Sequence, residues 1–263
     1  MDKPLSTFAR LVLLGAGGLA VVAGPVLYFF PDDTARYFAW TIQHPLTPVF
    51  MGAAYFAGIG NLLAVREDRW SLARVQLPAI IVFSSLMLIA TLLHIPIFDW
   101  SHPVAWAWLV VYVISPMAAT IVFFQMERGF NPPQFESRQM PRGFSTLIII
   151  AGGIQALIGA ALFLFPEHVS PLWAWSLTPL TSRVIGGWWL SGAALQLMLA
   201  RQETLHTAYV GLLANLLINS LLVAGALLHF GELNGPPASI AFYFSFCLAL
   251  VGISAFSWFR AGK

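Results

Sequence analysis

The amino-acid sequence predicts an all-α membrane protein with eight transmembrane helices, arranged as two parallel tandem four-helix repeats, with the N-terminus and C-terminus both cytoplasmic. Three observations lead to this fold class: an apolar composition, eight long uncharged runs, and landmarks that recur at one offset. Hydrophobic residues make up 59% of the 263 residues and charged residues only 9%, against about 45–50% and about 25% in soluble domains. The formal net charge of +2 is too small to indicate a nucleic-acid partner, so the expected partner is the lipid bilayer.

Each predicted helix is a run of mainly apolar residues. A helix needs about 20 such residues to cross a bilayer. Eight runs of roughly this length cover residues 11–30, 49–65, 77–98, 104–126, 144–165, 184–200, 207–230 and 238–259. Proline, glycine and charged residues gather between the runs, in stretches such as "FPDD", "REDRW" and "GELNGPP". These stretches are typical of loops.

The distribution of lysine and arginine predicts the orientation of the helices. With the N-terminus inside, eleven of the 13 Lys and Arg residues fall on the inner side, and only Arg36 and Arg183 fall on the outer side. Cytoplasmic loops carry an excess of these cations, so both termini are predicted to be cytoplasmic. Most tryptophans fall near the outer boundary, as in an aromatic belt at a membrane interface.

The two halves of the sequence carry the same landmarks at an offset of about 135 residues, the separation of His94 and His229. Both histidines end the tripeptide "LLH". The sequence "FPDD" followed by "AW" in the first half recurs as "FPEH" followed by "AW" in the second. This periodicity predicts an internal duplication, with a first repeat over 1–126, a cytoplasmic linker over 127–143 and a second repeat over 144–263. Because each repeat has an even number of helices, the predicted pseudo-two-fold axis lies along the membrane normal.

Neutral polar residues occupy the middle of the runs, whereas all eleven acids fall in loops or at helix ends. Buried ionisable groups usually mark ion-coupled transport, so their absence from the runs argues against a proton- or sodium-coupled carrier. The neutral polar residues have two interpretations: interhelical hydrogen bonds, or a polar seam near the repeat axis that lines a ligand cavity. This predicted seam contains Asn61, Ser84, Gln196, Asn215 and Asn219.

Arg183 is the outer-side cation that precedes two tryptophans, Trp188 and Trp189. One interpretation is an arginine that extends to lipid phosphates at the membrane boundary. The other is a binding site in which Arg183 anchors an anionic head group or ligand beside Trp188 and Trp189.

Histidines near the outer ends of the helices are the candidate cofactor ligands. The shared "LLH" context places His94 and His229 at one depth, where the two imidazoles would ligate a haem, a metal ion or a pigment if they face each other. Histidine and carboxylate side chains are also common metal ligands, which gives a wider candidate metal set. That set is His94, Asp99, His102, His229 and Glu232. The alternative is that each histidine is a polar tip at the membrane interface.

One stretch also resembles a known group of sequences. The segment "LTPLTSRVIGGWWLSGAA", followed by the short charged loop "RQETLH", is similar to a segment of uncharacterised multi-pass bacterial membrane proteins. The resemblance covers one helix and its flanks. It implies a bacterial integral membrane protein, in the cytoplasmic (inner) membrane, and it implies no activity and no functional residue.

Three functional hypotheses follow from these features. The first is a non-catalytic accessory or scaffold subunit of a larger membrane complex, because the loops are short and the runs carry no charge. The second is a membrane protein that binds a cofactor or lipid through the outer histidines. The third is a passive small-molecule transporter along the repeat axis. No catalytic residues are predicted, and the partner subunits are expected to be other membrane proteins.

Overall fold

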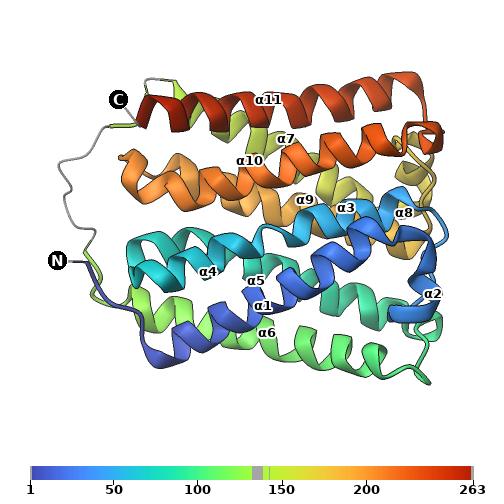
Figure 1. Ribbon diagram of the computed structural model, residues 1–263, viewed down its shortest axis with the longest axis horizontal. Coiled ribbons are helices and arrows are strands. Elements are labelled where there is room, and N and C mark those ends of the chain that lie inside the picture. The colour runs from blue at the N-terminus through green and yellow to red at the C-terminus, as the bar shows by residue number, and fades with distance from the viewer. Residues whose placement is uncertain (1, 132–138, 142, 262–263) are drawn as a thin grey trace.

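The computed structural model describes residues 2–131, 139–141 and 143–261 as a bundle of long helices that lie side by side (Figure 1). The N-terminus and the C-terminus lie at the same end of the bundle. The long helices are α1 (Thr7–Phe29), α3 (Leu46–Tyr55), α4 (Gly58–Glu67), α5 (Trp70–Leu93), α6 (Pro103–Glu127), α7 (Phe144–Leu164), α9 (Pro179–Ala200), α10 (Leu205–Leu228) and α11 (Pro237–Ala261).

Short helical turns connect the long helices at the end opposite the termini. They are η1 (Pro31–Asp33), α2 (Thr34–Tyr37), η2 (Ile95–Ile97), α8 (Pro166–Val169), η3 (Ser170–Leu172) and η4 (Phe230–Glu232). In the described part of the chain the remaining regular structure is one isolated β-bridge, between Gln139 and Thr204. The prediction of an all-α fold is therefore confirmed.

The start of α9 follows directly from its sequence. Thr178 is the N-cap, its hydroxyl accepts a hydrogen bond from the backbone N–H of Thr181 at 3.2 Å, and the Thr181 hydroxyl accepts from the N–H of Thr178 at 2.8 Å. This capping box satisfies two N–H groups that have no partner within the helix. Pro179 at the first helical position costs nothing there, because that position needs no N–H donor.

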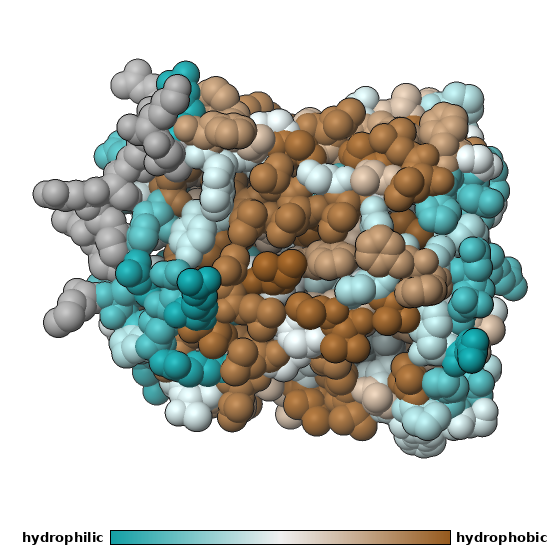
Figure 2. All heavy atoms as spheres, viewed as in Figure 1, coloured by the Kyte–Doolittle hydropathy of each residue, from teal (hydrophilic) through white to brown (hydrophobic). Residues whose placement is uncertain are grey.

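Seven helical segments are long and apolar enough to cross a membrane, with α3 and α4 together counted as one segment. On the face shown in Figure 2, an apolar band crosses the middle of the bundle between two more polar ends. Seven of the eight predicted spans are thus supported. The predicted span in α9 is not, because α9 is not apolar enough to be counted. Arg183 and Gln196 lower the hydropathy of α9, which packs against α5 and α7 and buries most of its residues. A helix enclosed by other helices needs little apolar surface of its own.

The predicted span 49–65 is divided in the structure into α3 and α4. At the junction, Phe56 N–H donates to the Ala53 carbonyl at 3.3 Å and Ala57 N–H donates to the Ala54 carbonyl at 3.1 Å. These bonds join residues three apart, so the chain tightens into a short 3₁₀ turn in mid-helix. Gly58 follows this turn and touches Ala20 of α1 so closely that no side chain fits there.

The two halves of the chain use corresponding helix contacts. Helix α1 packs on α3 and α4 as α7 packs on α9, and α5 packs on α6 as α10 packs on α11. Between the halves, α5 packs on α9 and α10 packs on α3 and α4. The third helical segment of each half therefore contacts the second segment of the other half, and these four segments form the centre of the bundle.

The end of the bundle that holds the termini is held together by basic residues. Lys3 donates to the carbonyl of Met126 at 2.7 Å, and Arg10 pairs with Asp68 at 2.6 Å. A further ion pair joins Arg74 to Glu127. We call this end the basic end. Three other predicted inner cations, Arg138, Arg142 and Lys263, lie outside the described residues, as does most of the predicted linker.

Candidate functional site

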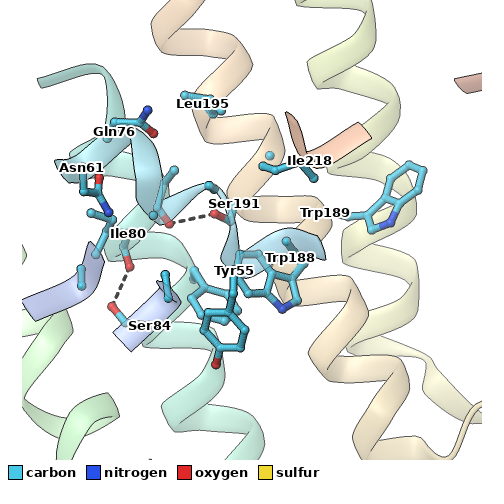
Figure 3. Close-up of a pocket in the computed structure, with 18 of the residues that line it drawn as sticks. Tyr55, Asn61, Gln76, Ile80, Ser84, Trp188, Trp189, Ser191, Leu195 and Ile218 are labelled. Carbon is cyan, nitrogen blue, oxygen red and sulfur yellow. Dashed lines mark hydrogen bonds between the residues drawn. The ribbon is translucent and has the colours of Figure 1, made fainter. Parts of the chain in front are cut away.

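A cavity of about 170 Å³ lies inside the bundle, and every long helix contributes to its wall (Figure 3). The lining comes chiefly from the four central segments. Helices α1, α6, α7 and α11 complete the wall from outside. The side chains that matter most for its chemistry are Tyr55, Asn61, Gln76, Phe83, Ser84, Tyr112, Ser115, Gln155, Trp188, Ser191, Asn215 and Asn219.

One wall of the cavity is aromatic. The rings of Phe83 and Trp188 stack with their centroids 3.8 Å apart and their planes 30° apart. Tyr55 meets Trp188 edge to face at 5.3 Å, and its hydroxyl shares a hydrogen bond of 2.8 Å with the hydroxyl of Tyr112. Aromatic rings in these geometries form a rigid apolar surface with the tyrosine hydroxyls already paired to each other.

Four buried polar atoms of the lining residues have no hydrogen-bond partner in the described structure. They are the Oδ1 atom of Asn61, the Nε2 atom of Gln76, the Oε1 atom of Gln155 and the Nε1 atom of Trp188. Asn61 is 6% exposed and Gln76 is 4% exposed, so bulk solvent does not satisfy these groups. A buried polar group without a partner costs about 1–3 kcal/mol, and such groups are rare in folded proteins. A bound molecule toward which these side chains turn, and which donates and accepts hydrogen bonds, would remove this cost.

Glycines make room for both glutamine amides. A Cβ atom on Gly60 would lie 2.6 Å from the Nε2 atom of Gln76, and a Cβ atom on Gly192 would lie 2.5 Å from the Nε2 atom of Gln155. Any larger residue at either glycine would displace the amide. Each amide carries both donors and an acceptor, so the two glycines preserve hydrogen-bonding capacity at the cavity wall.

Several other polar residues near the cavity already have partners. Gln196 and Asn215 exchange two hydrogen bonds between their amides, at 3.1 and 2.9 Å. Asn219 donates to the carbonyl of Asn215 at 2.8 Å, and Ser84 donates to the carbonyl of Ile80 at 2.6 Å. The structure thus brings Asn61, Ser84, Asn215 and Asn219 of the predicted seam to one cavity, and Gln196 lies behind the wall as the partner of Asn215.

The cavity lining contains no Asp, Glu, Lys, Arg or His within the described ranges of the chain. An ionised ligand would therefore be buried without a counter-charge, which is strongly unfavourable. The arrangement suits an uncharged molecule with an apolar body and a few polar atoms.

Sequence reasoning missed Gln76, Gln155 and the pair of tyrosines Tyr55 and Tyr112. Gln76 was outside the predicted span 77–98, although α5 begins at Trp70. Gln155 lies in the middle of an apolar run, but the position 135 residues earlier is Ala20. A search restricted to matched polar pairs could not find it. A search for every polar residue within the predicted runs would have found Gln155, whereas Gln76 lies one residue before its run.

At the end opposite the basic end, His94 contacts Arg183. The Nη1 atom of Arg183 lies 2.7 Å from the Nε2 atom of His94, the C-cap residue of α5. Because a guanidinium has no acceptor, this His94 nitrogen must accept the hydrogen bond and carry no proton. Burial, and secondarily the charge of Arg183, lower the pKa of His94. The Nε atom of Arg183 is buried and has no hydrogen-bond partner among the described residues.

Trp188 and Trp189 lie apart from the predicted anchor at Arg183. Trp188 stacks on Phe83 at the cavity, and Trp189 stacks on Phe246 of α11 with ring centroids 5.0 Å apart. Figure 3 shows the two indoles pointing in different directions from α9. Trp188 and Trp189 therefore both line the cavity, and Arg183 does not.

The remaining candidate metal ligands have local structural roles. The carboxylate of Asp99 accepts from the hydroxyl of Ser101 at 2.5 Å and from its N–H at 3.1 Å, and these bonds lower the pKa of Asp99. His102 is the N-cap of α6, and its Nδ1 atom accepts from the N–H of Val104 at 3.3 Å.

His229 is the C-cap of α10, the position that His94 occupies on α5, and Glu232 ends the η4 turn that follows. Among the described residues, no three His, Cys, Asp or Glu side chains are grouped so that they could hold a metal ion.

An all-helical bundle with an apolar band and several helices of membrane-crossing length defines a multi-pass helical membrane protein. No protein family, no curated protein and no solved structure matches the chain, so the class is not narrowed to a particular family. The cavity at the centre of the bundle is therefore the main guide to function.

Proposed function

We propose that this protein binds a small uncharged molecule in its central cavity, within the membrane. The observation that supports this function is a cavity with an aromatic wall, four of whose lining residues each carry a buried polar atom without a hydrogen-bond partner. Together they offer donors at Gln76 and Trp188 and acceptors at Asn61 and Gln155. A well-formed apolar pocket with a few convergent polar groups is the usual form of a ligand site.

The volume limits the ligand to a small size. An engineered apolar cavity of about 150 Å³ in another protein binds benzene, and this cavity has about 170 Å³. The ligand, or the part of it that enters, is thus about the size of one substituted ring. Water molecules would also satisfy the polar atoms, so the decisive test must separate a small organic ligand from water.

Phenol, toluene and benzoate form a matched set of probes for this site. Phenol combines a ring with a hydroxyl that donates and accepts, toluene lacks the hydroxyl, and benzoate carries a charge. We expect phenol to raise the melting temperature of the purified protein most, toluene less, and benzoate not at all. The Gln76→Leu variant should bind phenol about 2- to 10-fold more weakly, because one hydrogen bond contributes about 0.5–1.5 kcal/mol.

Gln202→Leu is the control for this experiment. Gln202 is also buried, but it lies beyond α9 at the basic end and donates to the carbonyl of Met198. That variant should lose stability and keep the full response to phenol. An equal response to phenol and benzoate, or an unchanged phenol response in Gln76→Leu, would refute a ligand site at this cavity and leave water as its occupant.

The proposed architecture is two tandem four-helix repeats, giving eight membrane spans with α9 as the sixth and both termini cytoplasmic. Its support is a pair of equivalent helix crossings. Gly24 meets Gly52 between α1 and α3, and Gly159 meets Gly186 between α7 and α9. The separation of Gly24 and Gly159 is 159 − 24 = 135, and that of Gly52 and Gly186 is 186 − 52 = 134. These values match the offset of the sequence landmarks.

The other functions indicated by the sequence stay predictions. An accessory role in a larger membrane complex would appear as co-purifying subunits in a native mass spectrum. Haem, metal or pigment binding at His94 and His229 would appear in the absorbance spectrum and metal content of the purified protein. Passive transport along the repeat axis and a bacterial inner-membrane location likewise stay predictions.

A further inference from the structure

One residue of the cavity wall also belongs to the outer surface of the bundle. Leu19 of α1 lines the cavity and is 47% exposed, and no other lining residue of the described chain is exposed to this degree. The wall at this point is therefore one side chain thick. Elsewhere, the lining residues are buried or half-buried.

Helix α6 packs against α1 and also contributes to the cavity wall. Val111 and Ser115 line the cavity from α6, and both are half-buried. Leu19 lies near the middle of α1 and Ser115 lies near the middle of α6, and both helices are candidate membrane spans. This part of the wall therefore faces the hydrocarbon core and not the water at either end.

The α6 backbone is weakened at the same place. Pro116 follows Ser115 and has no N–H, so it cannot make the helical hydrogen bond to the carbonyl of Tyr112, four residues earlier. Proline is a frequent cause of bending in helices. A small movement of α6 at Pro116, or a rotamer change of Leu19, would open the cavity toward the lipid.

We propose that the ligand enters and leaves the cavity sideways, from the hydrocarbon core, between Leu19 of α1 and Ser115 of α6. This inference rests on the proposed function and adds the ligand class, which is an uncharged, lipid-soluble small molecule. A charged compound is excluded twice, because the cavity wall has no counter-charge and the hydrocarbon core disfavours ions.

Cys247 provides a reporter for this route. It is the single cysteine of the chain, it is 2% exposed, and it lines the cavity from α11. The protein is reconstituted into lipid vesicles and treated with N-ethylmaleimide, which is neutral and about one ring in size, or with a methanethiosulfonate that bears a trimethylammonium group. Intact-protein mass spectrometry then gives the rate at which each reagent modifies Cys247.

We expect N-ethylmaleimide to modify Cys247 in the folded protein and the charged reagent to react far more slowly. Leu19→Trp and Ser115→Trp should each slow the neutral reagent by about tenfold or more, a change of at least ~1.4 kcal/mol in the barrier. The matched controls are Leu14→Trp on α1 and Ile114→Trp on α6, since Leu14 is 45% exposed, Ile114 is 57% exposed and neither lines the cavity. These controls should react at the wild-type rate.

Two outcomes would overturn the lateral route. They are equal slowing of the neutral reagent by the control variants and equal rates for the neutral and charged reagents. The labelling is run at a pH at which the folded wild-type protein reacts, because only the thiolate attacks either reagent. The labelling rate does not depend on the hydrogen bonds of Gln76. A normal phenol response with unaffected labelling in Leu19→Trp would therefore refute the route alone, and the reverse pattern would refute the ligand site alone.

Discussion

Gly159 on α7 and Gly186 on α9 face each other across a close helix crossing in the second half. A Cβ atom built on Gly186 would lie 2.7 Å from the carbonyl oxygen of Gly159, and one built on Gly159 would lie 2.8 Å from the carbonyl oxygen of Gly186. In the first half, a Cβ atom on Gly52 would lie 2.7 Å from the carbonyl oxygen of Gly24. Small residues permit such approaches, which strengthen packing between helices in lipid.

Alanine at Gly186 should therefore destabilise the fold. The added methyl would meet backbone atoms of α7 that cannot move aside, and overpacking of this kind costs about 1–3 kcal/mol. Thermal unfolding of the detergent-solubilised protein measures the change. Gly153→Ala, also on α7, is the control, because a Cβ atom there meets nothing within 4 Å. Equal stability of the two variants would argue against a tight crossing.

Two buried glutamines should respond in opposite ways to the same substitution. Gln196→Leu breaks both amide bonds with Asn215 and leaves that side chain unpaired, so we expect a loss of about 0.6 to 2 kcal/mol. Gln76→Leu removes an amide nitrogen that has no partner and should be neutral or stabilising in the ligand-free protein. Unfolding midpoints of the two variants, measured without added ligand, test this contrast. A larger loss for Gln76→Leu would contradict it.

Acidification should weaken the fold through His94. Its pKa is lowered below the usual 6.5 by burial and by Arg183, so the folded state favours the neutral ring. That contribution to stability is complete above pH 6.5, where the unfolded chain is also neutral, and is lost as the pH falls through the folded-state pKa. The melting temperature should therefore decrease as the pH is lowered below 6.5.

A His94→Gln variant isolates this effect. The glutamine oxygen can accept the hydrogen bond from Arg183 but does not titrate in this range. We expect a flatter pH profile than that of the wild-type protein. His44, whose pKa is also lowered by burial, remains in both proteins and contributes equally. Superimposable profiles would show that His94 does not carry the dependence.

The orientation inferred from the cations has a direct test. Reporter tags placed after Lys263 and within residues 131–139 should lie on the cytoplasmic side, because the inner loops carry eleven of the 13 cations. A tag between Asp32 and Arg36 should lie outside. A linker tag that reports outside would exclude two repeats with four spans each.

The sequence by itself determined the class of the protein and the positions of most helices. Composition and run length are local properties, and a bilayer admits few backbone structures other than helices and closed barrels. The cap formed by Thr178 and Thr181 is also local, but the predicted run 184–200 began five residues after α9 begins at Pro179 (184 − 179 = 5), because Arg183 and the polar residues before it interrupt the apolar run. The break between α3 and α4 could not be predicted, because it depends on the contact of Gly58 with Ala20 of another helix.

The chemistry of the cavity was decided only by the tertiary structure. The sequence indicated Asn61, Asn215 and Gln196 as one polar seam, but which amides pair depends on how the helices turn toward one another. Packing joined Gln196 to Asn215 and left Asn61 and Gln76 without partners. It also directed His94 toward Arg183, 89 residues away in the chain. A polar side chain in an apolar run has the same local sequence signal whether it is paired or free, so only the packed bundle distinguishes a structural hydrogen bond from a binding group.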